Sequence, residues 1–306
     1  MQRKVYSIWI AVLLLGISTG NAQIKKQFSV EGDDGVEQIN LNFRVNNGIC
    51  SIKAGDGNEA VTIYSNQDYN DYNHSFNKSI QGRICSIDLA LQDKNEQGLS
   101  QSISRSVFGT GKRERSSNYW RVYLNREKVY NLDLNYGLGQ ADIDLSGISV
   151  KNINVHTGSA DINVGYFADI SNQVQMDTFF VKVDMGTIAV KQLNRARSKY
   201  VKADIGFGDL LLDMTGETLE AGTIHGSVGA GNLFIVLPEE QTPMIVHVRD
   251  SWLCQVKLSE SFRPHGKNTF VNEAYEEDAS NIMSFFLDVS MGNIVFKEKK
   301  SSDHRR

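Results

Sequence analysis

The chain has 306 residues but only three prolines and three cysteines, and its one long hydrophobic run lies near its start. Three cysteines are too few for a fold held together by a disulfide framework. After residue 22 no stretch keeps apolar residues at helical spacing for more than three turns, and the best candidate, residues 272–283, is short. These absences exclude a helical protein. They leave short alternating segments separated by many of the 26 glycines, a pattern typical of β-strands and turns.

The chain also lacks the excess of basic residues that nucleic-acid binding requires. It has 32 Lys and Arg against 36 Asp and Glu, a formal net charge of −4. Nucleic-acid-binding domains carry a basic patch or stripe that neutralises phosphates. We therefore expect no nucleic-acid partner.

Motifs for catalysis, metals and cofactors are missing as well. Residues 109–112 (GTGK) are similar to a phosphate-binding loop, but Ser106 stands where the motif needs its first glycine and Arg113 where it needs Ser or Thr. No serine lies in a nucleophile elbow. The six histidines, at positions 74, 156, 225, 247, 265 and 304, show no paired spacing for a metal. We predict no catalytic residue, no metal site and no cofactor.

The first 22 residues have the layout of a secretory signal. Arg3 and Lys4 precede an apolar stretch from Ile8 to Ile17, and Ala22 ends a small-residue cleavage site. About ten apolar residues are too few to span the roughly 30 Å hydrocarbon core of a bilayer. We expect residues 1–22 to be removed, so that the mature chain is exported to the periplasm or the cell surface without a transmembrane segment.

A short phrase recurs along the chain, with apolar residues five and three positions before a glycine and two and four positions after it. The copies are centred on Gly48, Gly139, Gly158, Gly186, Gly208, Gly231 and Gly292. Alternation with a period of two places one face of a strand in a core and the other in water. The glycines from 139 to 231 are spaced by 19, 28, 22 and 23 residues, which suits about three short strands per coil. The pattern predicts an all-β parallel solenoid with coils of about 19–28 residues.

The same pattern suggests how the chain is organised. We expect one solenoid domain over residues 23–298, interrupted by the long polar stretch 93–118, which predicts an exposed loop. The irregular first seventy residues and residues 239–280 are candidates for caps that cover the ends of the stack. The basic residues 299–306 predict a frayed tail.

The cysteines allow two interpretations. Cys50 and Cys85 occupy the same place in two similar stretches, so a disulfide could join them if those stretches were stacked neighbours. Both residues, and Cys254 as well, also lie on the apolar side of their strands. Buried cysteine behaves as a small hydrophobe, and the odd count favours packing over a disulfide.

Aspartates recur beside the repeat glycines, at positions 142, 144, 161, 184, 204, 209 and 213. Stacked coils could bring some of them together into a calcium site or a carboxylate pair for sugar chemistry. Asp142 and Asp161 share one offset from their glycines and are the candidates for neighbours. Turn formation on the solvated face accounts for most such residues. Trp120 and Trp252 lie in alternating strands, where packing is favoured over sugar stacking.

Residues 132–145 (LDLNYGLGQADIDL) and 155–162 (VHTGSADI) resemble the toast-rack domains of bacterial cell-envelope proteins, with relatives in LiaF-type envelope-stress proteins and adhesin head domains. The resemblance spans residues 119–296 and is weaker over residues 23–92. It implies a right-handed β-solenoid and supplies no catalytic residues. LiaF-type proteins carry membrane helices before this domain, whereas this chain has only the predicted export signal, so their sensing role does not transfer directly.

These observations predict a non-enzymatic, exported protein of the cell envelope that acts as an adhesion, scaffold or binding module. Its partner would be an unidentified protein or glycan of the envelope. One alternative is a polysaccharide lyase or glycoside hydrolase, because β-helices also host such enzymes. A second is a periplasmic accessory protein in envelope-stress signalling. The sequence by itself identifies no binding residue.

Overall fold

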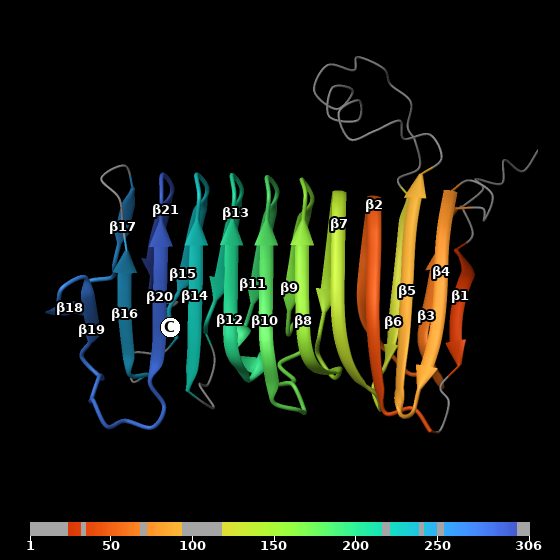
Figure 1. The fold of residues 1–306 in the computed structure, drawn as a ribbon, viewed down its shortest axis with the longest axis horizontal. Coiled ribbons are helices and arrows are strands. Elements are labelled where there is room, and N and C mark those ends of the chain that lie inside the picture. The colour runs from red at the N-terminus through yellow and green to blue at the C-terminus, as the bar shows by residue number, and fades with distance from the viewer. Residues whose placement is uncertain are drawn as a thin grey trace, which may run out of the picture.

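The computed structural model describes residues 24–31, 35–67, 72–93, 118–215, 221–238, 242–249 and 254–298. Within these ranges the chain is almost entirely β-strand, with one 3₁₀ turn, η1 (Leu193–Ala196). None of the helical structure described there has the length and apolar character needed to cross a bilayer. The strands stack side by side along the long axis of the molecule (Figure 1). The predicted signal and tail, and nearly all of the predicted loop at 93–118, lie outside the described residues.

Two sheets make up the stack, and the front sheet faces the viewer in Figure 1. Its central strands are parallel, because each coil repeats the path of the one before. In spatial order it contains β4 (Tyr72–Gln81), β5 (Ile84–Asp93), β2 (Gln38–Gly55), β7 (Val129–Asp144), β8 (Ser149–Thr157), β10 (Met176–Val183), β12 (Ser198–Ile205), β14 (Gly222–Val228), β20 (Met283–Val289), β16 (Met244–Arg249), β19 (Thr269–Asn272) and β18 (Phe262–Gly266).

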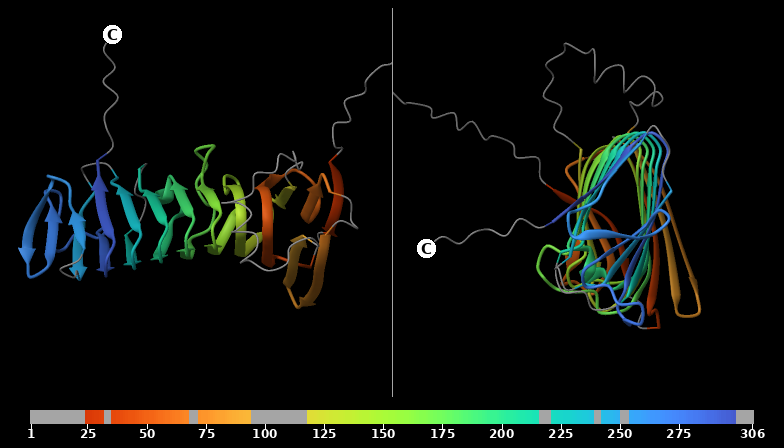
Figure 2. Two further views of the ribbon diagram at one scale, coloured as in Figure 1. Left: turned by 90° about the horizontal axis from the view of Figure 1, so that it is seen from above. Right: turned by 90° about the vertical axis from the view of Figure 1, so that its left-hand side faces the viewer.

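The back sheet lies behind the front sheet, and Figure 2 shows the coils turning from one to the other. It contains β1 (Lys25–Glu31), β3 (Glu59–Ser65), β6 (Tyr119–Asn125), the second halves of β2 and β7, β9 (Asp161–Gly165), β11 (Thr187–Lys191), β13 (Asp209–Asp213), β15 (Asn232–Val236), β21 (Asn293–Lys297) and β17 (Gln255–Lys257). The strands β2 and β7 pass through the corner and belong to both sheets.

Side chains alternate between the core and solvent along each strand. In β10, Phe179, Val181 and Val183 are buried, while the residues between them are only partly buried. The apolar positions of the repeat phrase lie in one continuous core throughout the stack. Burial of each such aliphatic side chain contributes about 1.5–3 kcal/mol relative to exposure. The prediction of an all-β parallel solenoid is therefore confirmed, but each central coil supplies two strands instead of about three, for example β10 and β11.

One copy of the repeat is aligned differently from the sequence expectation. Ala160, rather than Gly158, occupies the corner position beside Gly139 and Gly186, because the amide of Ser159 donates to the Gly137 carbonyl (2.8 Å). The side chain of Thr157 completes this corner by bonding both backbone groups of Ala160. Equivalent positions of successive coils, counted from Leu132 in β7, are consequently 21, 26, 22 and 23 residues apart in sequence. The spacing of the repeat glycines suggests 19, 28, 22 and 23.

The chain does not visit the coils in spatial order. Near the N-terminus, β2 lies between β5 and β7, although β5 comes after it in sequence. Near the C-terminus, β20 and β21 insert between the coil of β14 and β15 and the coil of β16 and β17. The strands β2, β20 and β21 are thus packed between two other coils, whereas β1, the first described strand, pairs with β3 alone.

Antiparallel strands cover both ends of the stack. At one end β4 pairs with β5, and β3 pairs with β1 and β6. At the other end β19 pairs with β16 and β18. Both predicted capping regions, the first seventy residues and residues 239–280, supply such strands. They protect most of the backbone that a parallel coil would otherwise leave unpaired.

A disulfide between Cys50 and Cys85 does not form, and all three cysteines of the chain are outside disulfides. The register explains why. Cys85 lies beside Ile39 in β2, whereas Cys50 lies eleven residues further along the same strand, beside Trp120. The two Cα atoms are therefore far beyond the roughly 5.5–6 Å separation of a disulfide. Cys50 and Cys85 are buried as packing residues, and Cys254 is half-buried.

Replacement of Gly208 by alanine is expected to destabilise the stack by about 2 kcal/mol or more, a large overpacking penalty. A Cβ at this corner would overlap the carbonyl oxygen of Gly186 and a methyl group of Val183. The matched control is Gly222→Ala, because the nearest atom to a Cβ there is the Ser198 oxygen at 3.5 Å. Urea unfolding should show a clearly lower free energy of unfolding for Gly208→Ala and an unchanged one for Gly222→Ala. Equal midpoints would contradict the close corner packing.

Cys50 is expected to resist alkylation by iodoacetamide in the native protein. Burial raises the pKa of its thiol to about 12, so almost no reactive thiolate exists near neutral pH. Mass spectrometry of labelled peptides should show Cys50 reacting only after unfolding in urea, and the half-buried Cys254 reacting earlier. Labelling of Cys50 without denaturant, at the rate of a small-molecule thiol, would contradict its placement.

Candidate functional site

The outer face of the front sheet carries side chains in long rows that run across the strands. Because parallel neighbours pair residue by residue, each outward position of one coil lies roughly 4.8 Å from its counterpart in the next. One row runs from Asp133 in β7 through Phe180 and His225 to His247 in β16. The chemistry of these rows changes from amides at the N-terminal end to aromatic rings at the C-terminal end.

Hydrogen-bonded amides line the N-terminal half of this face. Asn131 Nδ2 donates to Asn40 Oδ1 (2.8 Å), and Asn152 Nδ2 donates to Asn131 Oδ1 (2.9 Å). In the next row Asn154 Nδ2 donates to Asp133 Oδ1 (3.0 Å). These bonds orient the amides one coil after another, so the row offers fixed donors and acceptors to any polar molecule laid across it.

A hollow of about 400 Å³ lies over this half and is called the amide hollow here. It is lined by Asn40, Asn42, Asn77, Ser86, Asn131 and Asp133, among others. One wall comes from β4, which stands forward of the neighbouring strands in Figure 2. The lining is therefore rich in amide and hydroxyl groups, and it also contains the charged side chains of Lys78, Asp88 and Asp133.

Three rings stack on one another in the C-terminal half. The Phe286 ring lies between His225 (centroids 5.0 Å apart, planes at 14°) and His247 (4.8 Å, 16°). The Nδ1 atom of His247 lies 3.2 Å from the Thr269 hydroxyl, which holds the imidazole in place. Phe286 remains 40% exposed, since the ring faces cover each other while the ring edges point to solvent.

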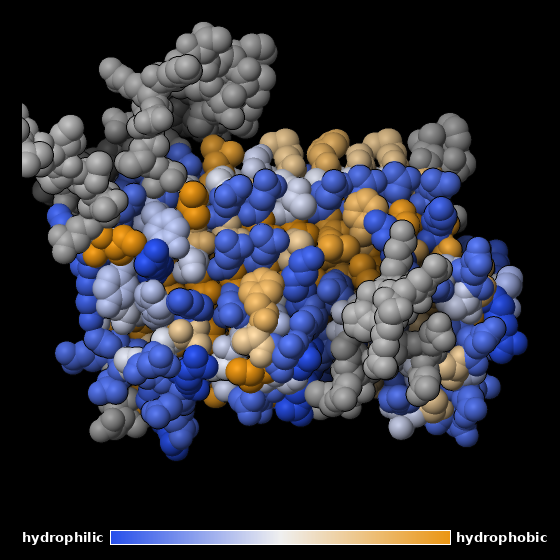
Figure 3. Space-filling model, turned by 180° about the vertical axis from the view of Figure 1, so that it is seen from behind, coloured by the Kyte–Doolittle hydropathy of each residue, from blue (hydrophilic) through white to orange (hydrophobic). Residues whose placement is uncertain are grey.

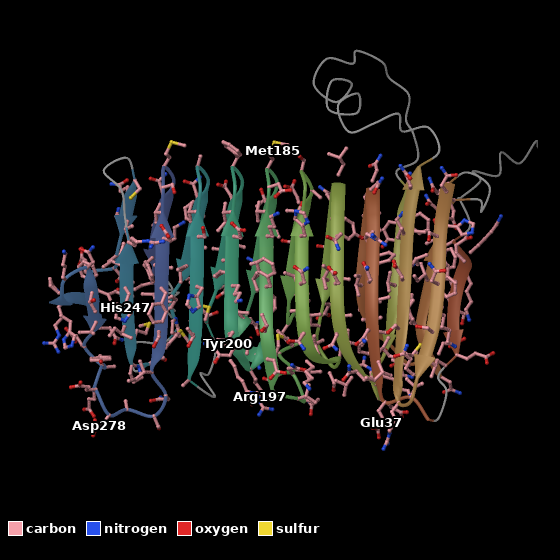
Figure 4. All side chains as sticks on the ribbon, viewed as in Figure 1. Glu37, Met185, Arg197, Tyr200, His247 and Asp278 are labelled. Atoms are coloured by element: carbon pink, nitrogen blue, oxygen red, sulfur yellow. The ribbon has the colours of Figure 1, made fainter. Side chains whose placement is uncertain are left out.

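These rings line a groove of about 520 Å³, called the aromatic groove here and lined by Phe180, Lys202, His225, His247, Arg249 and Phe286, among others. Figure 4 shows His247 on the front of β16, with Tyr200 on the front of β12. The negative charges of Asp204 and Asp288 balance the positive charges of Lys202 and Arg249 in this groove. Asp288 binds Arg249, and this bond raises the pKa of the guanidinium. The groove therefore has little net charge.

The arrangement suits recognition of a polar, weakly charged molecule. Imidazole nitrogens and the amides of the other half can donate to or accept from hydroxyl groups. The edges of the stacked rings supply apolar contact between these polar points. Pockets of 300–1,000 Å³ with a few oriented polar groups are the usual size for small-molecule sites.

A third hollow of about 410 Å³ lies on the back sheet, near Tyr64, Arg121 and Tyr123. Figure 3 shows the back of the molecule, where polar side chains border an apolar area. The partly exposed Phe234 in β15 belongs to this face and carries the Lys297 ammonium over its ring at 4.4 Å. The two front hollows share one face and one set of rows, to which the back hollow does not belong. The front face is therefore the better candidate.

Sequence reasoning missed the ring stack because of the order of the coils. His225 and Phe286 are 61 residues apart in sequence but adjacent in register, and His247 reaches the stack from a coil that precedes Phe286 in the chain. A signal was present for part of the row. His225 and Phe286 both stand six residues before a repeat glycine, as does Lys202. His247 belongs to no copy of the phrase, so only the tertiary structure places it.

Asp142 and Asp161, the two candidates for neighbours, do not lie opposite each other. Asp161 lies opposite Gln140, and Asp142 lies opposite Asn163, whose amide donates to it (3.0 Å). The two-residue shift at Ala160 causes this difference. In the described part of the chain, no three His, Cys, Asp or Glu side chains converge into a metal-binding group.

The two tryptophans that were weighed as sugar platforms give no such site in the described residues. Trp120 is buried in β6, where its ring meets Tyr72 edge-on at 4.9 Å. Trp252 lies outside the described residues. Among the other histidines, His156 is bonded to Asp184 (2.9 Å) on the front face. Trp120 is therefore not available to a ligand, whereas the rings of the aromatic groove are.

No curated protein matches the sequence. Among solved structures, a candidate cell adhesion protein from Clostridium sporogenes is similar over 90% of this chain and 100% of that chain, with 16% identity and a TM-score of 0.40. A likeness this distant carries no argument about function.

A family match is more informative. The N-terminal domain of toast_rack, DUF2154, matches residues 18–191, more than half of the chain. This range includes β1 to β11, and it therefore covers the early strands over which the resemblance in sequence is weaker. The chain belongs to the toast-rack family.

Proposed function

We propose that the chain is a non-enzymatic binding module of the cell envelope that holds a neutral glycan across the outer face of its front sheet. The observation that supports this proposal is the presence of two hollows on one face, the amide hollow and the aromatic groove, aligned along the same rows of side chains. From β5 to β16 these rows extend over eight strand spacings, roughly 38 Å at about 4.8 Å each.

A neutral glycan fits the chemistry of both hollows. Its hydroxyl groups can donate and accept, as the amides of Asn40 and Asn131 do, and its apolar ring faces can rest against the edges of Phe286 and its neighbours. The balanced charges of Lys202, Asp204 and the Arg249 ion pair give no preference for a strongly charged ligand. Repeated sugar units along the glycan would contact equivalent outward positions of successive coils.

Several carboxylates are engaged by neighbouring side chains. Glycoside hydrolases use two carboxyl groups about 5–10 Å apart, one of them kept protonated. Asp142 accepts a hydrogen bond from the Asn163 amide (3.0 Å), and Asp161 lies beside Gln140. In the groove, Asp288 is bound to Arg249 and is not placed as a proton donor. These contacts support binding over catalysis.

The envelope location rests on the predicted signal at residues 1–22. If it is cleaved as expected, the protein produced in a bacterial host with its own N-terminus should begin at Gln23. N-terminal sequencing of protein from the osmotic-shock or culture fraction checks this. A cytoplasmic chain that retains residues 1–22 would contradict the envelope role and leave the glycan proposal to be tested separately.

Phe286→Ala is expected to weaken oligosaccharide binding at least tenfold, about 1.4 kcal/mol. A panel of neutral and acidic oligosaccharides identifies the probe, and calorimetry then measures its Kd. The matched control is Phe234→Ala, which removes the same side chain from the back sheet and should leave the Kd unchanged. Asn131→Ala should also weaken binding if the ligand reaches the amide hollow.

Three outcomes would overturn the proposal. The first is that no oligosaccharide of the panel binds, and the second is that both phenylalanine variants weaken binding equally. The third concerns catalysis: chromatography of the bound oligosaccharide after incubation should recover it intact. Release of new chain ends, lost in Asp204→Asn or Asp288→Asn, would instead show an enzyme.

A further inference from the structure

The two ends of the stack of coils differ in how their edge strands are protected. Among the described residues, four strands have a partner on one side alone: β1, β4, β17 and β18. Such edges offer unpaired backbone groups to other chains, and proteins protect them with short length, bulges, charges or proline. Three of the four edges show these devices.

The protected edges are short, irregular or charged. β18 has five residues, contains Arg263 and Pro264, and has a register shift after the proline. β17 has only three residues and ends with Lys257. β1 has two register shifts and carries Lys25 and Lys26 at its start. None of them presents a regular template for another strand.

β4 has only one of these features, a single lysine. It is ten residues long, contains no proline and one lysine, Lys78, and pairs with β5 without a register shift from Tyr72 to Gln81. Most of its side chains are exposed, and they include two large apolar ones, Phe76 (38% exposed) and Ile80 (44%). In Figure 2 the β4–β5 hairpin stands forward of the body. β4 is therefore a long, regular and partly apolar edge.

We propose that β4 pairs antiparallel with β4 of a second copy of this chain, about a two-fold axis at Asn77, to form an end-to-end dimer. This register is self-complementary. It places Asn77 opposite Asn77 and Ser75 opposite Ser79, so amides and hydroxyls meet on one face of the new ladder. On the other face it places Phe76 opposite Lys78, where the ammonium can lie over the ring.

The surroundings of β4 favour a second copy over an unrelated strand. Phe76 already stacks with Phe28 of β1 (centroids 5.7 Å apart), so two such ring pairs would meet at the axis and bury apolar surface. A two-fold pairing also uses the one unprotected edge of each copy among the described strands. Because the far end of the rack is protected, assembly would stop at the dimer instead of continuing into a fibre.

A single cysteine at the axis tests the register directly. In the full chain with Cys254→Ser, Asn77→Cys should form a disulfide-linked dimer under mild oxidation, because residues opposite each other in a ladder have Cα atoms about 4.5–5.5 Å apart. Ser75→Cys alone should not cross-link, since its opposite residue is Ser79, whereas a mixture of Ser75→Cys and Ser79→Cys chains should. Cross-linking by Ser75→Cys but not by Asn77→Cys would overturn the proposal.

Sedimentation velocity of the unmodified chain tests the dimer itself. At micromolar concentrations we expect twice the monomer mass. The double variant Ser75→Lys and Ser79→Lys sets like charges against each other and should give monomers that stay folded, with an unchanged circular dichroism spectrum. The matched control, His265→Lys on the protected edge β18, should remain dimeric. A monomeric unmodified chain, or a dimer that survives both lysines on β4, would overturn the proposal without affecting the glycan experiment.

Discussion

The structure depends on the backbone contact between successive corners. At each corner an amide of one coil donates to a carbonyl of the previous coil, as Met185 does to Gly158 (2.8 Å), Phe207 to Asp184 (2.9 Å) and Met291 to Gly229 (2.8 Å). The residue that follows is glycine in most coils, because a Cβ there would overlap the neighbouring backbone. This contact sets where each coil turns, and it thereby sets the register of both sheets.

The register creates the candidate binding face. Inward positions are committed to the core, since each coil must bury apolar rows against its neighbours. Outward positions are free to vary, and in this chain they carry amides at one end and stacked rings at the other. A ligand that contacts several coils would therefore bind a surface whose spacing is decided by packing and whose chemistry is decided by residues that packing leaves free.

The two ends of the rack are built differently from its middle. Insertion places β2, β20 and β21 between other coils, so these strands have partners on both sides. The antiparallel strands beyond them act as covers. Of these covers β18 is short and interrupted by Pro264, whereas β4 is long and regular. The end that carries β18 is therefore protected, whereas the end that carries β4 is suited to strand pairing.

The sequence by itself determined the all-β class, the inward and outward positions and the absence of a helical core, because alternation with a period of two is a local property of each strand. It could not determine which residues become neighbours. A shift of two residues at Ala160 preserves the alternation and keeps Ile153 and Ile162 buried, yet it separates Asp142 from Asp161. The order of the coils is likewise not local. Only the tertiary structure brings His225, Phe286 and His247 together and places Cys50 far from Cys85, because those contacts depend on which coil packs beside which.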